Sequence, residues 1–292
     1  MQSKFAGRFL FALGLIEVIN YSLALPQRKE SDGMRYFAEL AYNGTRFFGW
    51  QRQPRQVSVQ STLEDAFSTI LNQPIAITGC GRTDTGVHAK QYFMHFDFEG
   101  SFPRGFDRRI NKFIGPDIVI YRFWEMEAEA HARFDATHRA YEYHLGFQKN
   151  PFAKETCYYY PFAASLSLDK MQAAALLLLS YAEFFPFCKS NTDVKTMICQ
   201  LQRAEWEVIA SDKKLIFHIA ADRFLRGMVR LIVGMCLNIG TGKITLDQVK
   251  QAMDTQQRLP KSLSVAPHGL FLTDIRYPFF DGGNASPILF DR

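Results

Sequence analysis

The same combination of strand-like runs and one main helix occurs twice along this chain, and this repetition constrains the fold more than any other feature. Along 91–98, Tyr92, Met94 and Phe96 alternate with polar residues, as in a strand with one buried face. The other strand-like runs are 36–42, 75–80 and 118–124 in the first half, and 139–147, 200–209, 214–220 and 270–275 in the second. The pattern predicts an α+β fold of two similar subdomains, with mostly antiparallel sheets and helices packed on one face.

Apolar spacing and end signals predict the helices. Val59, Leu63 and Phe67 recur at helical spacing after Ser58, which has the character of an N-cap. The strongly apolar run 223–239 ends at Gly240 and is expected to be the main helix of the second half. The remaining expected helices are 105–113, which is short and basic, 168–181, which follows Ser167, and 246–253, which follows Thr245.

The first 33 residues differ from the rest. Lys4 and Arg8 precede an apolar stretch that loosely resembles a signal peptide, but Glu17 and Asn20 make it too short and too polar for a membrane span. Met34 stands directly before the first strand-like run. We therefore expect residues 1–33 to be a dispensable extension, 34–135 an N-terminal catalytic subdomain, and 136–292 a C-terminal subdomain that completes the active site.

Composition permits a nucleic-acid partner without requiring one. The formal net charge of +5 allows a polyanion to bind, and 27 Phe with 12 Tyr supply flat faces that serve nucleic-acid sites or simply pack a core. The five cysteines include no C-x-x-C pair, so neither a disulfide framework nor a zinc site is indicated. Unpaired cysteines favour a reducing compartment, and we expect the protein to be cytoplasmic.

The loop 79–89 is where chemistry is expected, because glycines and small polar residues replace apolar ones between two strands. Asp84 could be a nucleophile, a general base, a metal ligand or a turn-capping residue. His88 could be structural or catalytic, and Arg82 could merely neutralise Asp84. No second acidic residue accompanies Asp84 at the spacing of a metal site or a glycosidase.

Six segments follow one another in the chain: Tyr42-Asn43-Gly44 with Phe48-Gly49-Trp50-Gln51-Arg52-Gln53; Ser58-Val59-Gln60-x-x-Leu63-Glu64; Gly81-Arg82-Thr83-Asp84-x-Gly86-Val87-His88-Ala89; His131-Ala132-Arg133-Phe134-x-Ala136-Thr137 with Arg139-x-Tyr141-x-Tyr143; Phe224 with Met228-Val229-Arg230-x-Ile232-Val233-Gly234; and Ala266-Pro267-x-Gly269-Leu270-x-Leu272. In this order, from about Tyr36 to about Pro278, the chain resembles the TruA family of tRNA pseudouridine synthases. Thr85 and the segment 111–116 depart slightly from the family pattern.

The resemblance implies an enzyme that isomerises uridine to pseudouridine at positions 38–40 of the tRNA anticodon stem-loop, in a cleft between the subdomains. It implies that Asp84 is the essential carboxylate, that Tyr141 stacks on the target uracil and that Arg230 pairs with the aspartate. It also implies that Arg82 holds the target nucleotide and that Leu270 forms part of an apolar wall. Otherwise Tyr141 would be an ordinary strand aromatic and Arg230 a surface charge, although a charge within so apolar a run needs a partner.

Further expectations concern partners. Basic side chains are expected to hold tRNA phosphates, namely Arg52, Arg104, Arg108, Arg109 and Lys112. No cofactor or metal is expected, because the isomerisation oxidises and consumes nothing. The resemblance and the limited basic surface of one chain predict a homodimer. The alternatives are an RNA-binding protein without activity, a hydrolase that uses Asp84 and His88, and an exported protein suggested by residues 1–33.

Overall fold

The computed structural model describes residues 33–189, 196–281 and 286–291, so the expectations for the N-terminal extension lie outside the described residues. Residues Asp32–Arg292 form one compact unit. Within the described residues, no helix is long and apolar enough to cross a membrane.

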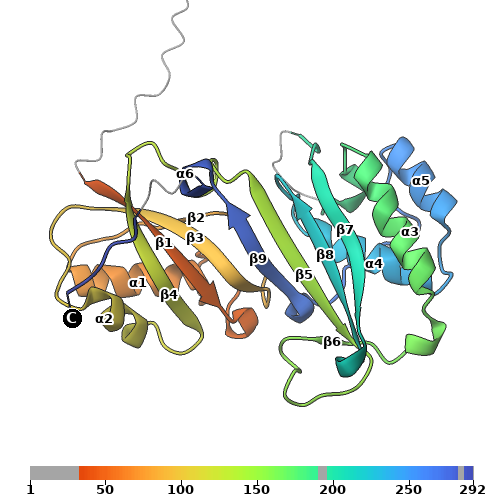
Figure 1. Cartoon of the computed structure of the whole chain (residues 1–292), viewed down its shortest axis with the longest axis horizontal. Helices are drawn as coiled ribbons and strands as arrows, with labels where there is room; N and C mark the ends of the chain where they lie inside the picture. Colours follow the sequence, from red (N-terminus) through yellow and green to blue (C-terminus); the bar gives the residue numbers. More distant parts are fainter. Residues whose placement is uncertain (1–32, 190–195, 282–285, 292) are drawn as a thin grey trace, which may run out of the picture. The chain divides into compact units, whose positions relative to one another are not determined.

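One nine-stranded sheet runs through the described chain (Figure 1), where the sequence predicted a sheet in each half. Its strand order is β4-β1-β3-β9-β5-β8-β7, with β2 paired to β3 and β6 to β5. The pairing is mostly antiparallel, as predicted, and only β3–β9 and β5–β6 are parallel. The strands are β1 (Met34–Tyr42), β2 (Thr78–Gly79), β3 (His88–Phe98), β4 (Ile118–Met126), β5 (His138–Gly146), β6 (Tyr158–Tyr159), β7 (Leu201–Ile209), β8 (Lys214–Ala221) and β9 (Leu270–Arg276).

The helices are close to the expected positions. They are α1 (Val59–Leu71), α2 (Phe106–Phe113), α3 (Leu168–Leu177), α4 (Met228–Gly240), α5 (Leu246–Asp254) and the short α6 (Pro278–Asp281). Ser58 and Thr245 are N-caps, and each takes part in a capping box with the residue three positions later. Ser167 occupies the N-cap position of α3 but makes no side-chain capping hydrogen bond.

Two sequence predictions were too long. In the run 75–80, only Thr78 and Gly79 pair with β3, because side chains of α1 satisfy the preceding backbone. The N–H of Ile75 donates to the Ser68 hydroxyl, and that of Ile77 donates to Glu64. The main apolar helix begins at Met228 rather than at 223, because Gly227 adopts a left-handed conformation with φ of 72° and so caps it.

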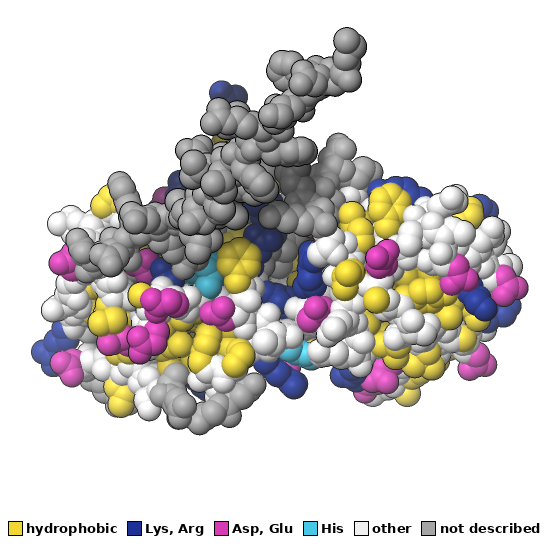
Figure 2. Space-filling model, turned by 90° about the horizontal axis from the view of Figure 1, so that it is seen from above, with side chains coloured by type: hydrophobic (Ala, Val, Ile, Leu, Met, Phe, Trp, Pro, Cys, Tyr) yellow, Lys and Arg dark blue, Asp and Glu magenta, His cyan; other side chains and the backbone are white. Residues whose placement is uncertain are grey.

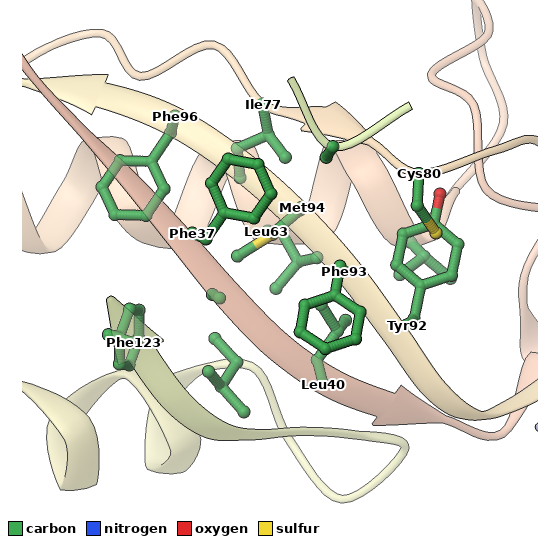
Figure 3. Close-up of a cluster of buried hydrophobic side chains, with 14 of the residues drawn as sticks. Phe37, Leu40, Leu63, Ile77, Cys80, Tyr92, Phe93, Met94, Phe96 and Phe123 are labelled. Carbon is green, nitrogen blue, oxygen red and sulfur yellow. The ribbon is translucent and has the colours of Figure 1, made fainter. Parts of the chain in front are cut away.

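The helices α1 to α4 cover one face of the sheet, as the sequence predicted. Leu40, Tyr92 and Phe96 belong to a cluster of buried aromatic and aliphatic side chains around β1 and β3 (Figure 3), and Phe96 meets Phe67 of α1. Across the β3–β9 pair, the same face continues to Tyr143, which is fully buried in a second cluster with the side chains of α4. The short α6 is an exception, because its residue Phe280 packs against Phe37 and Phe93 on the opposite face.

The two halves of the sheet are joined by one short strand pairing. The parallel pairing of β3 with β9 has only two residue pairs, His88 with Phe271 and Ala89 with Leu272. Side chains reinforce it: Nδ1 of His88 accepts from the N–H of Gly44, and its Nε2 lies 3.2 Å from the carbonyl oxygen of His268. His88 therefore links the turn after β1, β3 and the turn before β9 in its neutral form, with Nε2 as donor.

This junction should be sensitive to acid. Burial lowers the pKa of both His88 and His268 below the ordinary value. The unfolded chain then takes up protons at a pH where the folded chain does not, so the free energy of unfolding should fall as the pH drops from about 7.5 to about 5.5. His88→Asn should cost about 1–3 kcal/mol at the higher pH, because buried hydrogen bonds are lost, but should weaken the pH dependence. Urea denaturation at both pH values tests this, and an equal acid-induced loss in both proteins would contradict it.

Candidate active site

An aromatic loop supports the backbone around Asp84. The N–H of Trp50 donates to the carbonyl oxygen of Thr83 at 3.2 Å, and the Thr83 hydroxyl lies 2.8 Å from the hydroxyl of Tyr42. Gly49 has φ of 83°, and a Cβ there would stand 2.5 Å from the Thr83 carbonyl oxygen. The close approach therefore requires glycine at this position, and the segment 47–50 serves as the base on which the Asp84 loop rests.

Asp84 is bound by two cations that come from the second half of the chain. Its Oδ2 accepts from Nη1 of Arg230 at 2.8 Å and lies 3.4 Å from Nζ of Lys189. Nε of Arg230 donates to the carbonyl oxygen of Val265 at 2.7 Å, which fixes the plane of the guanidinium. The prediction that a charge within the apolar helix needs a partner is confirmed, and that partner is Asp84.

The side chain of Asp84 does not cap its own loop in the described structure. The turn is instead closed by backbone, since the N–H of Val87 donates to the carbonyl oxygen of Asp84 at 3.1 Å. Within the described residues, Oδ1 of Asp84 accepts no hydrogen bond, so one carboxylate oxygen is held by cations and the other remains available.

Tyr141 lies on β5, on the sheet face that α4 covers. Burial raises the pKa of its phenol well above the ordinary value, and the negative charge of Asp84 adds to this effect. The ring meets the edge of Phe224 with centroids 5.2 Å apart and planes at 90°. Tyr141 therefore offers a neutral aromatic group within electrostatic range of the carboxylate.

Leu270 contributes to the apolar surroundings. It is buried at the start of β9, opposite Tyr143, and belongs to the same cluster as Val87 of the Asp84 loop and Val229 of α4. The Asp84 loop, β9 and α4 thus each contribute an apolar side chain to one buried cluster.

The predicted RNA-binding residues lie elsewhere on the fold. Arg52 is bound by Glu64 and Asp65 of α1, at 2.7 and 2.6 Å. Arg108, Arg109 and Lys112 are exposed on α2, which packs on α1 and β4, and Arg104 is exposed just before it. Arg82 is exposed beside Asp84, and its guanidinium has no hydrogen-bond or ion-pair partner among the described residues.

Charge is mixed over the surface rather than concentrated. On the face shown in Figure 2, basic and acidic side chains are both widely spread, and several Lys and Arg side chains lie near its middle. Among the described residues, no group of three or more His, Cys, Asp or Glu side chains is arranged to hold a metal ion.

Sequence reasoning missed Lys189. Its partner Asp84 lies 105 residues away in the chain. The local sequence gives one weak hint, a lysine directly after the apolar residues Phe187 and Cys188, but it does not indicate the partner. His88, by contrast, has the structural role that was left open, because both of its ring nitrogens face backbone groups.

Comparison with known proteins agrees with this geometry. Residues 181–278 match the family model described as tRNA pseudouridine synthase. The chain is 43% identical over 247 residues to tRNA pseudouridine synthase A of Porphyromonas gingivalis, covering 84% of this chain and 97% of that protein. It is 42% identical to the Bacteroides fragilis protein of that name (84% and 96% covered), and 31% identical to the one from Bacillus pumilus (84% and 99%). With 43% identity to a relative of which it covers 97%, the chain belongs to the tRNA pseudouridine synthase A family of isomerases.

Proposed function

We propose that this protein isomerises uridine to pseudouridine at positions 38–40 of the tRNA anticodon stem-loop, with Asp84 as the essential carboxylate. The observation that supports this best is the ion pair of Asp84 with Arg230, set among apolar side chains beside Tyr141. One oxygen of this carboxylate is held by cations and the other is unoccupied, which suits chemistry at a glycosidic carbon.

The reaction breaks the C1′–N1 bond, turns the uracil and forms a C1′–C5 bond, while the hydrogen on C5 leaves as a proton and N1 takes up a proton. Asp84 can serve by attack on the ribose, by attack on the ring, or by taking a proton from the ribose. In each case the carboxylate form of Asp84 is the reactive one, and Arg230 and Lys189 both contact its Oδ2. Oδ1 is then the oxygen that meets the substrate.

The target base must leave its stack to reach Asp84. Tyr141 is placed to receive it, because a neutral aromatic ring can replace part of the lost stacking, at about 1–3 kcal/mol. Leu270 forms part of the apolar wall, and the exposed guanidinium of Arg82 holds the backbone of the extruded nucleotide.

The rest of the tRNA binds through phosphate contacts. The exposed cations on and before α2 can neutralise phosphates, and such contacts do not depend on the RNA sequence. Arg52 can do the same if a phosphate replaces one of the α1 carboxylates that now bind it. In this arrangement residues 34–135 and 136–292 act as two subdomains that form the cleft, with Asp84 from the first and Arg230 from the second. The reaction belongs in the cytoplasm, where tRNA is found.

The first test is Asp84→Asn. The amide is nearly isosteric but neither nucleophilic nor basic, so pseudouridine formation should fall by roughly 10³-fold or more. Tritium released from C5 of labelled uracil in tRNA measures the reaction, and filter binding measures affinity for tRNA, which should change little. Turnover near that of the unaltered protein would overturn the assignment, and free uracil as the product would indicate a hydrolase instead.

The second test concerns α2. Replacing Arg108, Arg109 and Lys112 together with Gln should weaken tRNA binding and reduce its dependence on salt concentration, because fewer counterions are released. The rate at saturating tRNA should stay close to normal. Lys250→Gln, an exposed lysine of α5, is the matched control. An unchanged salt dependence in the triple variant would remove α2 from the binding surface.

The third test concerns assembly. We propose a homodimer with each tRNA contacting both subunits, since the basic side chains of α2 and the carboxylate of Asp84 occupy different parts of one chain. Light scattering at the concentrations used in the activity assay should give twice the mass of one chain. A fully active monomer would refute the proposal.

A further inference from the structure

Lys189 is a second cation on the proposed catalytic carboxylate. Its Nζ lies 3.4 Å from Oδ2 of Asp84, the same oxygen that Arg230 binds at 2.8 Å. The Lys189 side chain is 35% exposed, against 14% for Arg230, so the ammonium lies on the more open side of the carboxylate. One carboxylate oxygen is thus held from two directions.

The backbone around Lys189 is fixed. The N–H of Lys189 donates to the carbonyl oxygen of Arg226 at 3.2 Å, just before α4. The preceding residue, Cys188, is 2% exposed, and its carbonyl oxygen accepts from Nη1 of Arg258 at 2.9 Å. A lysine anchored in this way delivers its side chain to one place, unlike a lysine on a free surface.

Gly227 leaves the space through which the side chain passes. A Cβ at this glycine would stand 2.9 Å from both Cδ and Cε of Lys189. The methylene chain of Lys189 therefore runs against the N-terminal end of α4, the helix that carries Arg230 three residues later. The N-cap of α4 and both cations form one local unit around Oδ2.

We propose that Lys189 is a positioning residue for the reaction, which rests on the function proposed above. With Arg230 alone, the carboxylate could turn about its Cβ–Cγ bond while keeping a single hydrogen bond. With the ammonium on the other side of Oδ2, that rotation separates a charge pair, so Oδ1 stays directed at the substrate.

The test compares Lys189→Met, which keeps the length of the chain without the charge, with Lys189→Arg, which keeps the charge. Lys250→Met on α5 is the matched control, because Lys250 is exposed and distant in sequence from every residue of the site. Single-turnover rates of tritium release from C5, tRNA dissociation constants and thermal midpoints are measured for each. Lys189→Met should lower the single-turnover rate about 10–100-fold with the dissociation constant and thermal midpoint unchanged, and Lys189→Arg should restore most of the rate.

The other outcomes contradict the proposal. A normal rate in Lys189→Met shows that Arg230 alone positions the carboxylate. A weaker dissociation constant with a normal chemical step assigns Lys189 to phosphate binding. A lower thermal midpoint in both variants, with rates that follow it, makes Lys189 structural. If the unaltered protein forms no pseudouridine, or Asp84→Asn remains active, the proposed function itself has failed, so the two failures are distinct.

Discussion

The ion pair between Asp84 and Arg230 is the interaction on which the arrangement of this molecule depends. Arg230 lies in α4 between Val229 and Leu231, both buried, so docking α4 on the sheet takes a guanidinium largely out of water. That is tolerable only if an anion and further acceptors meet it, and Asp84 with the carbonyl oxygen of Val265 supply them. Docking of α4 in the second half therefore requires the Asp84 loop of the first half. The Asp84–Arg230 ion pair thus contributes to folding as well as to the candidate site.

The sheet brings α4 and the Asp84 loop together through a short strand pairing. Only two residue pairs join β3 to β9, yet β3 begins directly after the Asp84 loop and β9 follows the turn that contains Val265. Gln91 strengthens the contact, since its Oε1 accepts from the N–H of Ile275 while its Nε2 donates to Glu39. Arg139 does so as well, by donating to the carbonyl oxygen of Cys80 at 3.1 Å. The short pairing of β3 with β9 thus begins close to the Asp84 loop and is reinforced by side chains.

Local sequence signals predicted the features that depend on neighbouring residues in the chain. Alternation placed the strands, Ser58 placed the start of α1, and an isolated charge in an apolar run correctly predicted a partner for Arg230. Contacts between residues far apart in the chain had no such local signal. The pairing of β3 with β9 joins residues far apart in the chain, and it turns two expected sheets into one. Lys189 was missed for the same reason, because its role comes from Arg226, Gly227 and Asp84 rather than from its neighbours in sequence.

Around Asp84, helices and loops supply one kind of side chain and strands supply another. Helix and loop bring the charged groups, because Arg230 and Lys189 can reach Oδ2 from different directions while their backbones stay fixed. The strands bring uncharged surface, because Tyr141 and Leu270 stand on the same buried face of β5 and β9. Burial keeps the Tyr141 phenol neutral, so the ring provides stacking area without competing for the cations. In the function proposed above, an extruded uracil meets apolar and aromatic surface on one side and Oδ1 of Asp84 on the other.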